Sequence, residues 1–512
     1  MQAKAEKERI MAIKRRDFLK TMSLGAASVA IPNLFSTCAQ KTAKPNIIYI
    51  LADDLGYGEL GCYGQDKIKT PNIDKIAAEG IRFTQHYSGS TVCAPSRCCL
   101  LTGKHTGHSY IRDNDELPER GDVWNDPDLE GQRPLLPNTE TIGTMLQRAG
   151  YTTGAIGKWG LGGPGSTGDP NKQGFDLFYG YLCQRVAHNY YPTHLWRNDE
   201  KHILEENEYF RPSKKLPEDK DPFDKESYAP YSGKQYSMDY MAEEALNFIE
   251  KNQNNPFFLY LPFPVPHVSL QVPEDSLQEY EGAFPETPYK GEKGYVPHIA
   301  PKAAYAAMIT RMDREIGKIL ALLKKLGLEK NTIVIFTSDN GPTYAGGVDA
   351  EFFESAGPLR GLKGSLYEGG IRVPMIARWP GKIQPGTTTD HISAFWDVMP
   401  TLAEITNTAV PQNIDGVSFL PTLLGKNDQQ EHEYLYWEHH SGGGKQAVRM
   451  NEWKALRLQV KGNPDAPIQL YNLTTDIAES EDVSQAHPEI VQKIDTIMKS
   501  RTPSKISRWN FK

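Results

Sequence analysis

The sequence predicts an α/β fold in which helices flank a large central sheet, followed by a smaller antiparallel sheet subdomain with a helix. Two patterns support this prediction. Up to about residue 405, apolar runs of strand length alternate with helical patterns, and beyond about residue 425 short alternating strands follow one another, separated by turns. The chain has 512 residues, of which 39% are hydrophobic and 24% charged, and this suits one large domain with a smaller partner.

The strands predicted in the first region are nearly continuous apolar runs, as expected for parallel strands that are buried on both faces. Helical patterns with recognisable start and stop residues lie between most of them. The predicted strands cover residues 46–51, 81–87, 151–156, 256–263, 332–336 and 373–378. The predicted helices cover residues 70–80, 139–150, 237–249 with Ser237 as its cap, 308–323 and 398–405.

Polar or charged side chains follow four of these predicted strands. Because ligands bind outside the carboxyl ends of the strands in open α/β sheets, we expect these side chains to converge although they lie far apart in sequence. Adjacent carboxylates such as Asp53 and Asp54 suit Ca²⁺ or Mg²⁺, although aspartate also favours caps and turns. Lys158 is either a surface charge or an anion contact. The four groups are Asp53 with Asp54, Lys158, His267, and Asp339 with Asn340.

The segment around Cys93 is the most distinctive in the chain. Cys93 stands two residues before Pro95 and four before Arg97, and a small apolar run at 98–101 follows at once. This arrangement predicts that residue 93 lies near a helix N-terminus, where backbone N–H groups and Arg97 favour an anion. The alternative is a structural cysteine that precedes a helix.

The chain after residue 387 is predicted to form a connection, which ends near residue 425, and then the small subdomain. An insertion rich in charge and proline at residues 198–234 is predicted to be a long surface loop near the mouth of a pocket. Antiparallel strands of the subdomain are predicted at 434–437, 446–449, 453–457 and 469–471, with a packing helix at 488–498.

Residues 1–43 are predicted to be an export segment that takes no part in the fold. Residues 14–20 match the twin-arginine export pattern, and residues 22–35 supply a moderately apolar stretch. Cys38 follows in a sequence that resembles a lipoprotein processing site, so a lipid anchor at Cys38 and an ordinary signal peptide cut nearby both remain open. We therefore expect an exported protein, either periplasmic or an outer-membrane lipoprotein.

The charge and the cysteine content exclude some classes of protein. The formal net charge is −7, which argues against nucleic-acid binding as the main function but leaves room for a local basic pocket. The chain has six cysteines, and two of them, Cys98 and Cys99, are adjacent in an apolar run. This is not the pattern of a disulfide framework.

Cys-x-Pro-Ser-Arg at 93–97, followed by Leu-Thr-Gly at 101–103, resembles the signature of type I sulfatases. Further separated motifs extend the resemblance from about Lys44 into the C-terminal subdomain. It implies an alkaline-phosphatase-like α/β catalytic domain with a mixed central sheet at 44–425, and a smaller C-terminal subdomain at 426–512. It also implies hydrolysis of sulfate monoesters, with Cys93 oxidised by a separate maturing enzyme to formylglycine, whose aldehyde hydrate is the nucleophile.

The resemblance also implies roles for individual residues around a divalent metal, usually Ca²⁺ with Mg²⁺ as the alternative. Arg97 would stabilise the hydrate, and Lys158 and Lys363 would bind the sulfate oxygens. His267, in its protonated form, would give a proton to the departing sugar oxygen, and Asp339 is expected to accept one. The implied metal ligands are Asp53, Asp54, Asp339, Asn340 and residue 93.

One position departs from the family pattern. The common motif is Gly-Lys-Trp-His-Leu-Gly, whereas Gly160 occupies the position of the histidine here. In the family that histidine helps to orient the hydrate and release sulfate, and His105, His108 or His188 are candidates to replace it. A subset of bacterial polysaccharide sulfatases resembles Gly-Lys-Trp-Gly-Leu-Gly-Gly-Pro-Gly, the sequence at 157–165, which favours a variant enzyme.

This subset implies a carbohydrate O-sulfatase, with terminal 4-sulfated galactose or N-acetylgalactosamine as the expected substrate. Contacts to the substrate are expected from less standard segments. Arg112 and Asn114 shortly follow the nucleophile helix, and Arg185 and His188 lie in a loop, 184–191, whose hydrogen-bonding and stacking groups suit a sugar.

Three alternatives remain open. A phosphonate or phosphodiester hydrolase of the same superfamily can use the same formylglycine and metal. Gly160 also leaves open a non-catalytic exported glycan-binding protein on a sulfatase scaffold. An enzyme that uses unmodified Cys93 predicts activity while the thiol is retained.

Overall fold

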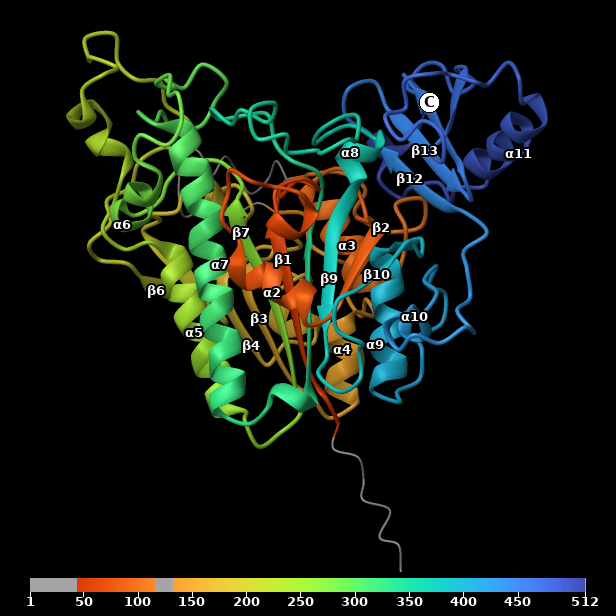
Figure 1. Ribbon diagram of the computed structural model, residues 1–512, viewed down its shortest axis with the longest axis horizontal. Helices are drawn as coiled ribbons and strands as arrows, with labels where there is room; N and C mark the ends of the chain where they lie inside the picture. Colours follow the sequence, from red (N-terminus) through yellow and green to blue (C-terminus); the bar gives the residue numbers. More distant parts are fainter. Residues whose placement is uncertain (1–43, 116–129, 131, 512) are drawn as a thin grey trace, which may run out of the picture. The chain divides into compact units, whose positions relative to one another are not determined.

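The computed structural model describes residues 44–115, 130 and 132–511, and the expected export segment with Cys38 lies outside these residues. The described chain forms a large mixed sheet with helices on both faces and a smaller antiparallel sheet toward the C-terminus (Figure 1). No helix within the described ranges is long and apolar enough to cross a membrane.

The large sheet consists of eleven strands of the described chain. From edge to edge they are β10 (Thr387–Thr389), β2 (Ile81–Tyr87), β9 (Arg372–Arg378), β8 (Thr332–Ser338), β1 (Asn46–Asp53), β7 (Phe257–Pro266), β3 (Thr152–Lys158), β4 (Leu177–Tyr181), β5 (His194–Arg197) and β6 (Glu200–Ile203), and β11 (Ser393–Ala394) also pairs with β2. The central neighbours β8, β1, β7 and β3 are parallel. Antiparallel pairs on both sides of them, such as β8–β9 and β4–β5, make the sheet mixed, as expected.

Helices cover both faces of this sheet, because successive side chains of a strand point to opposite faces. In β1, the buried Ile48 and Ile50 pack into one core, and the buried Ile47 and Tyr49 pack into the other. This double burial explains the continuous apolar sequence of β1, and Figure 1 shows α5 and α7 side by side over the sheet. The first core includes residues of α2 (Pro71–Ala78), α5 (Ser237–Lys251) and α7 (Pro301–Lys325), and the second includes residues of α3 (Cys93–Thr102), α4 (Ile142–Arg148) and α9 (Val398–Ile405).

The predicted central strands and long helices are confirmed, with differences in detail. The helix predicted at 139–150 is the shorter α4, because Thr141 and Thr144 form a capping box at its start. Ser237 is the first residue of α5 and not its cap, since the cap position is Tyr236 and carries no side-chain cap hydrogen bond. The predictions from the sequence do not include β4, β5 and β6. Short helices α6 (Glu274–Leu277), α8 (Glu368–Ile371) and α10 (Leu420–Leu423) lie in the connections.

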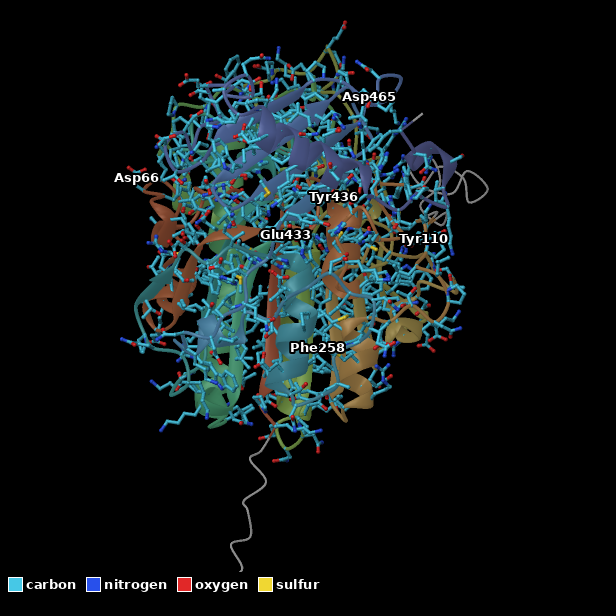
Figure 2. All side chains as sticks on the ribbon, turned by 90° about the vertical axis from the view of Figure 1, so that its right-hand side faces the viewer. Asp66, Tyr110, Phe258, Glu433, Tyr436 and Asp465 are labelled. Carbon is cyan, nitrogen blue, oxygen red and sulfur yellow. The ribbon has the colours of Figure 1, made fainter. Side chains whose placement is uncertain are left out.

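The C-terminal subdomain has the predicted antiparallel strands and packing helix. β12 (Leu435–His439), β13 (Lys445–Met450), β14 (Trp453–Leu458) and β15 (Ile468–Asn472) pair in sequence order, and α11 (Pro488–Lys499) packs on one face. On the other face, Leu435 and Trp437 share a core with Tyr87 of the large sheet. In Figure 2 the C-terminal sheet, with Tyr436, lies above the large sheet, with Phe258. The subdomain therefore packs on the catalytic domain at one end of its strands.

Buried ion pairs also join the subdomain to the catalytic domain. Lys454 of β14 lies 2.8 Å from Glu368 of α8 and 3.2 Å from Glu479, and all three side chains are buried. Glu368 also pairs with the buried Arg372. Since α8 follows closely on the loop that carries Lys363, these contacts hold that loop against the subdomain.

The charged insertion at 198–234 is largely exposed, as predicted, and it packs against a second surface loop. The backbone N–H of Leu216 donates to the carbonyl of Lys290 at 2.9 Å. A small apolar cluster with Val296 is formed by Leu216, Tyr228 and Tyr231. The insertion therefore supports the loop at residues 289–298.

His86 of β2 is expected to make the protein sensitive to acid. It is fully buried, its ring packs against Phe395 and Phe419, and its Nδ1 lies 2.9 Å from Ser393 Oγ. Burial, with a smaller effect of His391, lowers the pKa of His86 from 6.5 to about 3. The unfolded chain therefore binds a proton that the native state excludes, and the free energy of unfolding should fall by about 1.4 kcal/mol per pH unit from this residue as the pH drops below its ordinary pKa.

Denaturant unfolding at a series of pH values between about 7 and 4 measures this effect. His86→Leu cannot take up the proton, so its unfolding free energy should depend less steeply on pH than that of the wild type. Equal slopes for the two proteins would contradict the assignment, whatever their absolute stabilities.

Candidate active site

The carboxyl ends of the four central strands bring the predicted polar side chains together. Because β8, β1, β7 and β3 are parallel neighbours, the residues that end or follow them lie at the same edge of the sheet. The predicted convergence is therefore confirmed by the strand order. In that order, the side chains are Asp339 with Asn340, Asp53 with Asp54, His267, and Lys158.

Cys93 is the first residue of α3, as the sequence predicts, and it faces this cluster. The extended Val92 is the cap residue, and every residue of α3 is buried. Cys93 Sγ lies 3.4 Å from Asp53 Oδ1 and 3.5 Å from Lys363 Nζ. Burial and the charge of Asp53 raise the pKa of the Cys93 thiol to about 12, so the thiol is not ionised at neutral pH. This argues against an enzyme that uses an unmodified thiol as its nucleophile.

Arg97 lies one turn further along α3 and is completely buried between carboxylates. Its Nη2 is 3.0 Å from Asp53 Oδ2 and 2.8 Å from Asp339 Oδ2. Although burial opposes it, Lys158 and Arg97 hold the pKa of Asp53 well below its usual range. Arg97 therefore compensates two buried carboxylates that would otherwise repel each other.

Both carboxylate oxygens of Asp339 accept hydrogen bonds, which the sequence does not predict. Its Oδ2 accepts hydrogen bonds from Arg97, and its Oδ1 accepts one from the backbone N–H of Asp54 at 3.1 Å. Burial and the charge of Asp53 raise the pKa of Asp339 to about 6 against the effect of Arg97. Asp339 thus retains the ability to take up a proton near neutral pH, but both of its oxygens already have donors.

Lys158 and Lys363 add two positive charges to the cluster. Lys158 Nζ lies 2.5 Å from Asp53 Oδ2, and Lys363 Nζ lies 2.7 Å from Asp54 Oδ1. The loop of Lys363 is fixed at its base, because the N–H of Gly364 donates to the carbonyl of Thr91 at 3.0 Å. Together with Arg97, the lysines balance the formal charge of Asp53, Asp54 and Asp339.

His267 lies beside Asp54, with Nε2 3.6 Å from Asp54 Oδ2, and its Nδ1 faces the carbonyl of Val268. Burial and the charges of Lys363 and Lys158 hold the pKa of His267 well below its usual range. The ring is therefore neutral in this arrangement, in contrast to the protonated form that the family resemblance implies. A bound anion would offset the lysines and favour protonation.

The donor set of the cluster fits a hard divalent cation. Ligand atoms of Asp53, Asp54, Cys93 and His267 all lie within 4.8 Å of one another, and the four residues are buried. Asn340 adds a buried Oδ1 that accepts no hydrogen bond from any part of the described chain. Such an oxygen is costly to bury without a partner, and carboxylate and amide oxygens are the ligands that Ca²⁺ prefers.

His188, a predicted substrate contact, stacks on His267. Their ring centroids lie 4.6 Å apart with an interplanar angle of 7°. His105 and His108, the other candidates to replace the missing histidine, lie next to Asp415 instead. Of these three described histidines, His188 is the one placed beside the catalytic cluster.

Gly160 stands where the family pattern has a histidine. Its φ is +76°, in the left-handed region that favours glycine. The nearest atoms to a Cβ built there belong to Gln184, with Oε1 at 3.5 Å. Gln184 is buried, and its Oε1 accepts no hydrogen bond from the described residues. Gln184 therefore lies next to the position that a histidine occupies in the family pattern.

The other predicted substrate contacts have different surroundings. Arg112 is buried and forms an ion pair of 2.9 Å with Glu438 of β12. It therefore stabilises the junction between the catalytic domain and the C-terminal subdomain and does not contact the cluster. Asn114 is exposed, and its Oδ1 accepts a hydrogen bond of 3.1 Å from the N–H of Ala94 at the start of α3. Arg185 is half-buried and directly precedes the short helical turn that contains His188.

Taken together, the sheet and the cluster define an alkaline-phosphatase-like α/β hydrolase whose buried acids and cations suit an anionic ester. Residues 45–408 match the family model described as Sulfatase, and residues 362–504 match the one described as N-sulphoglucosamine sulphohydrolase, C-terminal. The chain therefore belongs to the sulfatase family and is a sulfuric ester hydrolase.

Individual relatives agree with this assignment. The chain is 30% identical to an N-acetylgalactosamine-6-O-sulfatase of Bacteroides thetaiotaomicron, over 90% of this chain and 94% of the relative. It is 31% identical to arylsulfatase A of Homo sapiens, over 88% and 86% of the two chains. A solved structure of Ps i-CgsB in complex with k-i-k-neocarrahexaose is similar with a TM-score of 0.72 and 29% identity, over 92% and 95% of the chains.

Tyr295 lies beside the cluster and is absent from the sequence predictions, whereas Gln184 enters them only as part of the loop at 184–191. Gln184 lies in the predicted sugar-binding loop, so the composition of that loop could have singled it out. Tyr295 packs against His188 and His267 but lies in an irregular loop without periodicity or motif. No sequence signal identifies it.

Proposed function

We propose that the protein hydrolyses O-sulfate monoesters of carbohydrates, so that the ester and water give a free sugar hydroxyl and hydrogen sulfate. The observation that carries this proposal is the gathering of Arg97, Lys158 and Lys363 around Cys93 in a member of the sulfatase family. A sulfate monoester carries a negative charge that these cations complement. The carbohydrate assignment is supported by the relative named for N-acetylgalactosamine and by the similar structure that holds neocarrahexaose.

The proposed nucleophile is formylglycine at position 93, made from Cys93 by a separate maturing enzyme. In its hydrated form this group supplies one hydroxyl that attacks sulfur and a second through which sulfate is expelled. The place of Cys93 at the N-terminus of the buried helix α3 supports this proposal. Arg97, anchored on Asp53 and Asp339, holds positive charge next to this position.

A bound Ca²⁺, with Mg²⁺ as the alternative, would be held by Asp53, Asp54, Asp339, Asn340 and residue 93. The cation would supply positive charge that acidifies the hydrate and offsets its repulsion of the anionic ester. The buried Asn340 Oδ1, which lacks a donor among the described residues, supports this ligand set.

Calcium is expected to stabilise the protein, and Asn340→Ala is expected to weaken that effect. Binding to the native state alone adds about 2.7 kcal/mol at a calcium concentration a hundredfold above Kd, and loss of one ligand should weaken affinity by about tenfold or more. Thermal unfolding with Ca²⁺ and with chelator measures both. Asn331→Ala, at the opposite end of β8, is the matched control and should respond to calcium like the wild type. Equal calcium responses of wild type and Asn340→Ala would refute the ligand.

The two lysines are proposed to bind the sulfate oxygens. Lys158 and Lys363 approach residue 93 from different elements, the end of β3 and the loop before α8. From these positions they can stabilise the charge that gathers on the equatorial oxygens as sulfur is attacked. Asp339 is proposed to accept a proton released from the nucleophile.

His267 is proposed to donate a proton to the departing sugar oxygen. Its Nε2 faces the cluster while Nδ1 is held by the carbonyl of Val268. His188 stacks on His267. We propose that His188 also helps to orient the nucleophile, the role of the family histidine whose position is occupied by Gly160 in this chain. This leaves the leaving-group side of the site lined by two imidazoles.

For the sugar itself, we propose terminal galactose or N-acetylgalactosamine, with sulfate at O4. Asn114, exposed at the start of α3, and Arg185 with His188 remain the proposed contacts, and Arg112 is a weaker candidate because of its ion pair with Glu438. The relative named for the 6-O-sulfate makes O6 the main competitor.

We also propose that residues 1–43 direct export to the periplasm or the outer membrane, with Cys38 lipidated unless the segment is cut as an ordinary signal peptide. The mass of the mature N-terminus distinguishes the two, since a lipid adds a diacylglycerol group at Cys38.

The test of the function is sulfate release from galactose, N-acetylgalactosamine and N-acetylglucosamine carrying sulfate at O3, O4 or O6. The protein is co-produced with a maturing enzyme and supplied with Ca²⁺, and a phosphodiester and a phosphonate ester are assayed alongside. Release from one isomer supports the proposal and identifies the hydroxyl. Phosphodiester or phosphonate turnover without sulfate release would contradict it, and binding of sulfated sugar without any turnover would favour the glycan-binding alternative.

A further inference from the structure

Tyr295 is an aromatic residue in a strained backbone conformation at the edge of the catalytic cluster. Its φ is +64°, in the left-handed region that bulky side chains rarely adopt. Its ring packs edge-on against the two stacked imidazoles. The ring centroids lie 5.3 Å from His188 and 5.9 Å from His267, with interplanar angles of 66° and 73°. Such strain persists only where the surroundings enforce it, and it concentrates at ligand sites.

The loop that carries Tyr295 is braced in a way that maintains this conformation. Tyr289 and His298 close its base with two backbone hydrogen bonds of 2.9 Å. The hydroxyl of Tyr289 crosses the loop and donates to the carbonyl of Gly294, directly before Tyr295. On the other side, Val296 is anchored in the apolar cluster of the charged insertion. Both neighbours of Tyr295 are thus fixed, so the aromatic side chain is held in place before any ligand arrives.

The phenol of Tyr295 faces the catalytic charges and is available for a ligand. The side chain is half-buried, and its hydroxyl makes no hydrogen bond with any residue that the structure describes. Burial raises the pKa of Tyr295, with Lys363 opposing and Asp54 adding to the shift. The hydroxyl is therefore a neutral donor close to the groups that surround residue 93.

We propose that Tyr295 is a specificity-determining residue that contacts the leaving sugar, with its hydroxyl donating a hydrogen bond to a sugar oxygen and its ring forming the wall beside His267. The inference rests on the proposed carbohydrate sulfatase function. Arg97, Lys158 and Lys363 already provide charge for the sulfate, whereas an uncharged donor matches the hydroxyls and ring oxygen of a sugar. The contact belongs to the leaving group because the ring packs on His188 and His267.

The test compares Tyr295→Phe with the wild type on two esters: the sugar sulfate that the wild type hydrolyses best, and 4-nitrophenyl sulfate, whose leaving group has no sugar hydroxyls. Loss of the hydrogen bond should lower kcat/KM for the sugar ester by about tenfold and leave the aryl ester within about twofold. Turnover of the aryl ester also shows that the variant is folded. The matched control is Tyr240→Phe on α5, which removes a half-buried hydroxyl that accepts a hydrogen bond from Gln235, and it should leave both esters unchanged.

Each other outcome overturns the inference in a recognisable way. Equal activity of Tyr295→Phe and wild type on the sugar ester shows that the hydroxyl makes no productive contact. Equal losses on both esters assign the hydroxyl to the shared sulfate group and not to the sugar. A wild type that hydrolyses 4-nitrophenyl sulfate but none of the sugar sulfates refutes the proposed function, and the sugar contact with it.

Discussion

Cys93→Ala is expected to lower the rate of sulfate release by on the order of 10⁴-fold or more, the usual consequence of removing a nucleophile. Alanine cannot be converted to formylglycine, so neither the attacking hydroxyl nor the hydroxyl that expels sulfate can form. The surrounding cations remain, because Arg97, Lys158 and Lys363 are held by the carboxylates of the cluster. Binding of the sulfate ester should therefore survive the substitution while turnover is lost.

The measurement is sulfate release under single-turnover and steady-state conditions, with the mass of the peptide that contains residue 93. Conversion to formylglycine exchanges H₂S for oxygen, so the mass of the wild-type peptide reports maturation directly. The matched control is Cys98→Ala, in the same helix and fully buried in the apolar core. It should cost about 1 kcal/mol of stability and keep its activity. Wild-type activity of Cys93→Ala, or full activity of protein whose residue 93 is entirely thiol, would refute the proposed nucleophile.

Arg97→Met is expected to destabilise the protein by about 3–5 kcal/mol, because it leaves buried carboxylates without their counter-charge. Arg97 Nη2 lies 3.0 Å from Asp53 and 2.8 Å from Asp339, and all three side chains are completely buried. Methionine replaces the volume of the side chain but none of its charge. The loss should be largest with chelator and smaller with Ca²⁺, because a bound cation would offset the same carboxylates.

Denaturant unfolding with Ca²⁺ and with chelator measures both parts of this expectation. The matched control is Arg112→Met, which removes a buried arginine 2.9 Å from Glu438. Its cost should be smaller, since Glu438 also pairs with Arg501, and it should not depend on calcium. A calcium-independent cost for Arg97→Met would contradict the placement of the metal beside Asp53 and Asp339.

The residues at the strand ends could be found from the sequence because each follows a recognisable apolar strand. A continuous apolar run, such as that of β1, shows where a buried strand ends, and parallel strands place their carboxyl ends together. Asp53, Lys158 and His267 therefore need no long-range information to be assigned to one region. Cys93 and Arg97 are likewise linked by local spacing, since one helical turn separates them.

Residues whose partners lie elsewhere in the chain could not be assigned in this way. Arg112 follows α3 closely and suits an anion, but its carboxylate partner Glu438 lies 326 positions away, and their ion pair places Arg112 at the domain junction. The charge state of His267 also depends on its distant neighbours, since Lys363 and Lys158 help to keep the ring neutral. The burial of Arg112 and the charge state of His267 depend on contacts between residues far apart in the sequence, which a local sequence pattern cannot show.

The sequence by itself determined the central strands and long helices of the catalytic domain, the antiparallel C-terminal sheet and the candidate residues at the strand ends. It could do so because each rests on periodicity, capping or spacing within a short segment. Only the tertiary structure decided that Tyr295 and Gln184 border the site and that Arg112 does not reach it. These placements depend on loop closure and on burial of charges against partners far along the chain, and both arise only when the elements pack.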